Sequence, residues 1–156
     1  MTEGFQTQEN KVFRLSMLKG KPTVVGMIFN HCTYACPRLT ADINNIEDSL
    51  KNEKEKLNFL LISFDTKRDT QDRLNKFADE MGLNKNWILL HGSEDAVRTL
   101  SILLNVQFEK DAEDNFSHGN LVSVLNKNGV LQYQKEGLGA VHAETITTIK
   151  KLIQQR

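Results

Sequence analysis

The feature that most constrains the fold is a pair of short apolar runs separated by a helical pattern. The runs TVVGMIF (23–29) and LNFLLISF (57–64) are typical of strands buried on both faces. Between them, apolar residues recur at spacings of four, three and four, as on a helix that lies against a sheet: Leu39, Ile43, Ile46 and Leu50. Two such strands joined through a helix predict a right-handed parallel crossover.

The next part of the chain continues this alternation. We expect a second helix from Asp69, acting as its N-cap, to Gly82. A third buried strand is expected at 87–91, followed by a third helix capped by Ser93. Residues 106–119 are polar and aperiodic, and we expect them to form a long exposed loop.

The end of the chain carries a hairpin signal and a last helix. Segments 120–126 and 130–136 flank Lys127-Asn128-Gly129, whose Asn-Gly pair is typical of a tight β-turn. A final helix is expected from Ala143. The complete order predicts the α/β class: a thioredoxin-like three-layer α/β/α sandwich, with a central mixed β-sheet and a C-terminal β-hairpin plus helix.

Length and charge restrict both the domain count and the partners. The 156 residues suit one domain, and we expect residues 1–10 to form a flexible N-terminal tail and 11–156 to form a single domain. The 20 basic residues balance the 20 acidic ones, which argues against nucleic acid as a partner. No apolar run has the ~20 residues of a transmembrane helix, and residues 1–13 are polar, unlike a signal peptide.

The only two cysteines, Cys32 and Cys36, follow the first predicted strand in the segment HCTYACP. Sites of parallel α/β sheets collect at the C-terminal ends of strands, and a helix N-terminus there stabilises thiolates. A purely structural bridge is a weak explanation, because so short a loop gives little entropic stabilisation. A redox pair and a metal site remain the two active interpretations.

The spacing of the cysteines bears on this choice. Residues four apart on a helix have Cβ atoms ~5–6 Å apart, whereas a disulfide needs ~3.5–4.5 Å. Two thiolates that share an ion at ~2.3 Å each would accept the wider separation more easily. The spacing therefore favours a metal without excluding a disulfide.

A histidine supplies the third candidate ligand. His118 lies in Ser117-His118-Gly119, ahead of the strand expected to face the cysteines. Thioredoxin-type oxidoreductases carry a cis-proline at that point, but the only prolines here are Pro22 and Pro37. Two thiolates and an imidazole form a soft, low-coordination set that suits copper.

Three segments together carry a resemblance to a known family: KGKPTVVGMIFNHCTYACP (19–37), LISFDTKRDTQDRL (61–74) and SHGNLVSVLNKNGVL (117–131). The chain resembles the Sco (SenC) family of copper-binding assembly factors for respiratory oxidases. The resemblance implies a thioredoxin-like fold and copper ligands at Cys32, Cys36 and His118. It also implies that Asp65 lies beside the thiols without binding the metal.

Two departures from the family pattern concern the delivery target rather than the ligands. Many members have an aspartate between the cysteines, where this chain has Thr33, Tyr34 and Ala35. Many also have Asp-Pro after the second strand, where this chain has Asp65 and Thr66.

The function implied is that of a metallochaperone, not of an ordinary enzyme. It would bind Cu(I) or Cu(II) and pass the copper ion to the copper-binding subunit of a respiratory oxidase, or to another copper or thiol carrier. The alternative is a thiol–disulfide oxidoreductase acting on such a subunit or another exported protein, in which Cys32 attacks and Cys36 resolves. The resemblance implies a periplasmic location, membrane-anchored through an N-terminal segment that this sequence does not show.

The remaining histidines, His31, His91 and His142, are interpreted as structural or surface residues. A peroxiredoxin-like peroxidase is disfavoured, because the Pro-x-x-x-Thr-x-x-Cys arrangement is absent.

Overall fold

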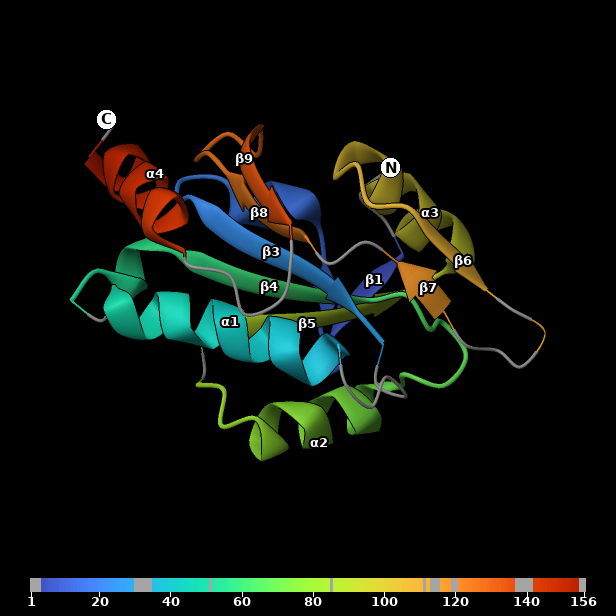
Figure 1. Ribbon diagram of the computed structural model, residues 1–156. Helices are drawn as coiled ribbons and strands as arrows, with labels where there is room; N and C mark the ends of the chain where they lie inside the picture. Colours follow the sequence, from blue (N-terminus) through green and yellow to red (C-terminus); the bar gives the residue numbers. More distant parts are fainter. Residues whose placement is uncertain are drawn as a thin grey trace.

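The computed structural model describes residues 4–29, 35–50, 52–84, 86–110, 112, 116–118, 121–136 and 142–154, without the side chains of 35–37, 54, 110 and 116–118. Figure 1 shows a central sheet with helices packed on it. The strands are β1 (Phe5–Thr7), β2 (Val12–Phe13), β3 (Thr23–Ile28), β4 (Asn58–Ser63), β5 (Trp87–Gly92), β6 (Phe108–Lys110), β7 (Phe116–His118), β8 (Leu121–Leu125) and β9 (Leu131–Glu136). The helices are α1 (Ala35–Ser49), α2 (Gln71–Glu80), α3 (Glu94–Leu103) and α4 (Ala143–Gln154), with short 3-10 turns η1 (Leu15–Leu18) and η2 (Lys54–Lys56).

Within the described residues the main sheet has seven strands in the order β2-β1-β5-β4-β3-β8-β9. β3 and β4 are parallel, as are β4 and β5, while β8 runs antiparallel to β3. The predicted crossover through a helix is confirmed, because α1 connects β3 to its parallel neighbour β4. The α/β class with a mixed central sheet is confirmed as well.

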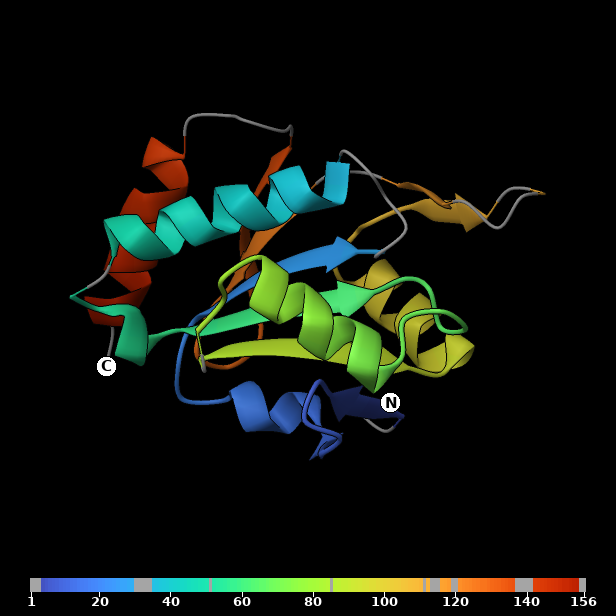
Figure 2. The ribbon, with the colours of Figure 1, turned by 90° about the horizontal axis from the view of Figure 1, so that it is seen from below.

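The two faces of the sheet are covered by different helices. α1 and α2 cover one face, and Figure 2, which looks from below, places both in front of the strands. The apolar stripe predicted for α1 is buried on this face: Leu39, Ile43, Ile46 and Leu50. On the opposite face, η1 and α3 lie over Val25 and Leu60.

The C-terminal hairpin and helix form as predicted. β8 and β9 pair antiparallel, and Asn126 Oδ1 accepts hydrogen bonds from Asn128 N at 2.9 Å and Val130 N at 3.0 Å. Gly129 has a φ of 81°, a left-handed conformation that favours glycine. α4 buries Ile149.

The segment 106–119 differs from the predicted exposed loop. β6 and β7 pair antiparallel within it, and Val106 and Phe108 are buried. Apolar residues at positions 106 and 108, separated by a polar one, already show the alternation of a half-buried strand. The prediction was wrong because an alternation that spans only residues 106–108 is too short to stand out from its polar surroundings.

The start of α2 also differs from the prediction. The N-cap is Thr70, whose side chain accepts a hydrogen bond from Arg73 N at 3.4 Å. Asp69 is instead buried, and its carboxylate accepts a hydrogen bond from the Ser63 hydroxyl. Both residue types can cap a helix, so the sequence alone did not separate the two neighbours.

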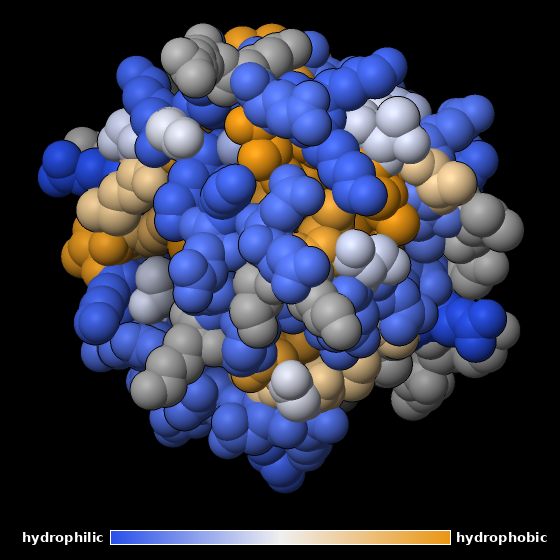
Figure 3. All heavy atoms as spheres, turned by 90° about the vertical axis from the view of Figure 1, so that its left-hand side faces the viewer, coloured by the Kyte–Doolittle hydropathy of each residue, from blue (hydrophilic) through white to orange (hydrophobic). Residues whose placement is uncertain are grey.

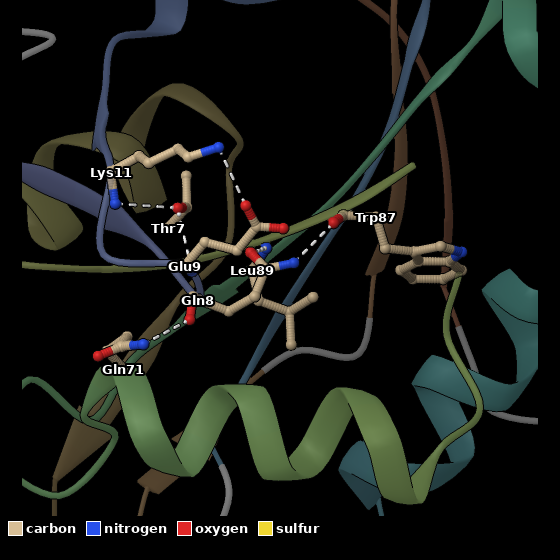
Figure 4. A network of polar contacts seen from close by, with 7 residues as sticks. All are labelled: Thr7, Gln8, Glu9, Lys11, Gln71, Trp87 and Leu89. Atoms are coloured by element: carbon tan, nitrogen blue, oxygen red, sulfur yellow. Dashed lines mark hydrogen bonds and ion pairs between the residues drawn. The ribbon is translucent and has the colours of Figure 1, made fainter. Parts of the chain in front are cut away.

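Residues 5–7 belong to the sheet, whereas we expected residues 1–10 to be a flexible tail. β1 pairs antiparallel with β5, and Phe5 is only 1 % exposed. Beyond β1, Gln8 extends the pairing with its side chain (Figure 4): Nε2 donates to Trp87 O at 2.8 Å, and Oε1 accepts from Leu89 N at 3.0 Å. Gln71 Nε2 in turn donates to Gln8 O at 3.0 Å and ties α2 to this edge.

The surface on the side of α4 is mainly hydrophilic, with apolar side chains visible only in patches between polar ones (Figure 3). None of the helices in the described part of the chain combines the length and the apolar character of a membrane-spanning segment.

Close packing of α1 on β3 generates a test of the fold. A Cβ at Gly26 would lie 2.9 Å from Ile43 Cδ1, so Gly26→Ala should lower the free energy of unfolding by about 1–3 kcal/mol. Ile43→Val alone should cost about 0.5–1.5 kcal/mol, since it removes that δ-methyl group. In the double variant the new Cβ at position 26 no longer meets a δ-methyl group. The loss of unfolding free energy, measured in urea, should therefore be smaller than the sum of the losses in the two single variants. Strict additivity would contradict this packing.

Candidate functional site

The candidate site lies at the C-terminal ends of the parallel strands. β3 and β4 end side by side at Ile28 and Ser63, and Phe64 N donates to Ile28 O at 2.7 Å. This bond brings Asp65 next to the point where the chain leaves β3 for the cysteine segment. Figures 1 and 2 both show the first turn of α1 and the β6–β7 ladder at this same end of the molecule.

Asp65 is held in one orientation. It is 3 % exposed, and its backbone N–H donates to Ser63 Oγ at 3.0 Å. Its Oδ1 accepts from Arg68 N at 3.0 Å, and its Oδ2 forms an ion pair with the Arg68 guanidinium. Because both carboxylate oxygens have partners, the negative charge of Asp65 keeps a constant position. The residue lies at the predicted edge of the sheet.

Next to this corner lie three more polar residues, Ser63, Asp69 and His91. Ser63 donates its hydroxyl proton to Asp69, and strand alternation from the pair Ile62↔Leu90 places Ser63 and His91 on the same face of the sheet. Burial lowers the pKa of His91, and the carboxylate of Asp69 opposes that shift more weakly. His91 Nε2 is buried without a hydrogen-bond partner among the described atoms.

The β6–β7 ladder is anchored to the same corner by an aromatic contact. The ring of Phe108 lies 4.5 Å from that of Phe64, and the guanidinium of Arg98 lies 3.8 Å above it. Arg98 Nη1 also donates to Phe108 O at 3.1 Å. Because Phe108 is the register partner of His118, the backbone of His118 is carried to the edge that holds Asp65.

A hollow of about 290 Å³ opens between these elements. It is lined by the corner after β4, the N-terminal part of α3 and Phe108 of β6. Acidic and basic side chains share this lining: Asp65 and Lys67 come from the corner after β4, and Glu94, Asp95 and Arg98 come from α3. The hollow therefore offers a mixed polar surface next to the strand that carries His118.

The structure describes only part of the predicted ligand set Cys32, Cys36 and His118. The backbone of Cys36 lies in the first turn of α1 and that of His118 at the end of β7, but neither side chain is described. Cys32 lies outside the described residues, as does His31. Among the side chains that are described, no three His, Cys, Asp or Glu are grouped as metal ligands, so the set Cys32, Cys36 and His118 stays a prediction.

His142 takes the structural position expected of it. It precedes α4, and its Nε2 lies 4.0 Å from Asp42 Oδ2 on α1. Sequence reasoning missed three other residues of the site region, namely Ser63, Arg98 and Phe108. Arg98 and Phe108 had no motif to mark them, since their contact joins a helix to a strand that was taken for a loop.

The family profile of SCO1/SenC matches residues 4–154, nearly the whole chain. The chain belongs to the SCO1/SenC family. A curated relative, the SCO1 protein homolog of Bacillus subtilis, is 29% identical over 129 residues, which cover 80% of this chain and 67% of the relative.

Solved structures show the same fold. A SCO1/SenC family lipoprotein from Bacillus anthracis aligns with a TM-score of 0.90 at 26% identity, covering 99% of this chain and 94% of that one. Bradyrhizobium japonicum ScoI, solved with copper bound, aligns with a TM-score of 0.82 at 21% identity and covers 96% of each chain. BsSco, described as carrying a disulfide switch, aligns with a TM-score of 0.86 at 23% identity, covering 98% of this chain and 92% of that one.

The half-buried imidazole of His91 predicts that stability depends on pH. Its folded pKa lies below the unfolded value of 6.5, so protonation favours the unfolded chain. Its contribution to stability is complete above that value and is lost as the pH falls toward the folded pKa. Between about pH 7.5 and 5, wild type should lose more unfolding free energy in urea than His91→Gln, which keeps a polar group that does not titrate there. An equal loss of unfolding free energy in both proteins would contradict a lowered pKa of His91.

Proposed function

We propose that this protein is a copper metallochaperone in which Cys32, Cys36 and His118 bind the ion. The observation that carries the proposal is the β6–β7 register, because it brings the backbone of His118 to the sheet edge where the first turn of α1 contains Cys36. Membership of the family and the copper bound to Bradyrhizobium japonicum ScoI support copper as the cargo.

The chemistry follows from the donor set and its surroundings. Two thiolates and one imidazole suit Cu(I), and two anionic sulfurs with a nitrogen also accept Cu(II). The start of α1 favours the thiolate form of Cys36, because unpaired backbone N–H groups lie at a helix N-terminus. Three ligands leave a position open to a donor from a partner, so copper can pass by exchange of one ligand at a time.

Asp65 is proposed as a charge that acts on the thiols without binding the ion. Arg68 contacts both of its oxygens, one through its backbone N–H and the other through its guanidinium, and this fixes the position of the carboxylate. The carboxylate would therefore orient the donors around it rather than compete with them. This separates its role from that of the three proposed ligands.

We further propose that the receiving partner is the copper-binding subunit of a respiratory oxidase, or another copper or thiol carrier. The proposed location is the periplasmic side of a membrane, with the protein anchored to it. Support comes from the family and from the Bacillus anthracis relative, which is named as a lipoprotein.

Substitution of the proposed histidine ligand tests the copper site. In His118→Ala the affinity of the reduced protein for Cu(I), measured by competition with a chromophoric chelator, should fall by more than the ~10–100-fold typical of losing an outer partner of a metal ligand. His91→Gln is the matched control, because it removes a histidine from the same end of the sheet and should bind copper as wild type does. Unchanged affinity in His118→Ala would exclude the three-ligand site.

A second candidate function is thiol–disulfide exchange, favoured by the disulfide switch described for BsSco. The Cys32 thiolate would attack a disulfide of the partner and form a mixed disulfide. Cys36 would then displace the partner, which leaves as a dithiol while Cys32 and Cys36 form a disulfide. Two electrons thus pass to the partner, and only the reduced form could bind copper.

The two functions differ in their need for His118. Reduction of a model disulfide peptide by His118→Ala should proceed within about twofold of the wild-type rate, since the imidazole takes no part in the exchange. Cys36→Ser should instead stop at the mixed disulfide, which mass spectrometry detects. If wild type fails to reduce the peptide while it binds copper, the oxidoreductase alternative is excluded.

A further inference from the structure

Exposed apolar side chains gather on one face, away from the candidate site. Among the side chains that the structure describes, five large apolar ones are 54–72% exposed. Four of them, Met17, Ile102, Leu103 and Val130, stand on η1, on the C-terminal part of α3 and on the turn between β8 and β9. We call this set the η1–α3 face. The fifth, Val12, lies on the edge strand β2.

Each of the four residues lines one apolar hollow or is next in sequence to a residue that lines it. Its volume is about 250 Å³, and its lining comes mostly from leucines of the same three segments: Leu15, Leu18, Leu100, Leu103, Leu104 and Leu131. Leu103 itself lines the hollow, Met17 lies between two lining residues of η1, and Val130 lies between Gly129 and Leu131. The exposed residues therefore stand on the same three segments that line this hollow. Contiguous patches of this kind mark interaction sites more often than scattered apolar residues do.

The surroundings of this face are basic. Gly20 N donates to Lys127 O at 2.9 Å, which brings Lys19 and Lys21 beside Lys127. No Asp or Glu occurs in residues 10–41, 96–108 or 115–135, which include all segments of the face. Directly before β4 the chain carries two acidic residues, Glu53 and Glu55. Two lysines, Lys54 and Lys56, alternate with them in sequence.

This face and the candidate site lie at opposite ends of the parallel strands. Thr23, the first residue of β3, pairs with Leu125, the last residue of β8, so the β8–β9 turn is at the N-terminal end of β3. The candidate site is at the C-terminal end, after Ile28. A partner on the η1–α3 face would leave the site edge open.

We propose that the η1–α3 face docks on the surface of a bilayer that contains anionic phospholipid. The four apolar side chains would enter the boundary between headgroups and acyl chains, while the three lysines contact phosphates. A second copy of this chain is a poorer occupant, because a two-fold interface through this face would bring two lysine clusters together. The inference does not depend on copper binding.

Vesicle binding by the full chain tests the proposal. In flotation assays we expect binding to vesicles of phosphatidylcholine with phosphatidylglycerol, weak binding to pure phosphatidylcholine, and release at high salt. Lys19→Glu, Lys21→Glu and Lys127→Glu combined should reduce the partition coefficient by at least about fivefold per lysine. The matched control changes three exposed lysines of other helices by the same total charge: Lys76→Glu, Lys150→Glu and Lys151→Glu.

A second set of variants tests the apolar part without changing charge. Met17→Ser, Ile102→Ser and Val130→Ser combined should lower binding to the anionic vesicles at least tenfold, since exposed methyl and methylene groups no longer enter the interface. Val12→Ser, which removes an equally exposed apolar residue from another edge, should bind as wild type does.

Three outcomes would overturn the proposal. One is the absence of binding to anionic vesicles by a folded wild-type protein. Another is an equal loss in the test and control lysine variants, which would assign binding to overall charge alone. The third is a concentration-dependent dimer in sedimentation velocity that Ile102→Ser abolishes while vesicle binding is unaffected, which would identify a second copy as the occupant.

Discussion

The candidate site depends on how the chain turns after β4. Ser63 receives a hydrogen bond from Asp65 N and donates its own proton to Asp69, so one hydroxyl holds the backbone of Asp65 and the carboxylate of Asp69. Phe64, between them, is bonded to the end of β3 and packs on Phe108. The end of β3, the corner that holds Asp65 and the β6–β7 ladder are thereby coupled through three consecutive residues, Ser63, Phe64 and Asp65. The positions of the residues at this edge are fixed by buried polar contacts on a rigid sheet, and not by the surrounding loops.

Most of the fold could be predicted because its long elements have periodic apolar patterns. β3, β4 and the stripe on α1 are each continuous over enough residues to exclude another structure, and the hairpin has its own turn residues. Two-residue and three-residue strands carry no such signal. β1 and β6 form because distant strands and rings receive them, as Phe5 and Phe108 illustrate, and this information is not local in sequence.

The site could be predicted from the sequence only as far as chemistry marks residues individually. Cysteines, a histidine and an aspartate at strand ends are conspicuous, and Asp65 does lie buried at the expected edge. The residues that hold such groups in place are ordinary ones. Arg98 acquires its role from a contact between α3 and β6, and Ser63 acquires its role from the turn that follows β4, so no spacing rule could identify them.

The side-chain pairing of Gln8 with β5 has a consequence for solubility. Without residues 5–8, β5 would be the outermost strand on its side of the sheet, with the apolar run Trp87–Leu90 and a row of unpaired amides open to other chains. Such an edge is a template for intermolecular strand addition. β1 covers its far half, and the glutamine amide imitates a peptide group over the rest. Residues 5–8 thus protect the edge of β5 against intermolecular strand addition, in addition to their part in the fold.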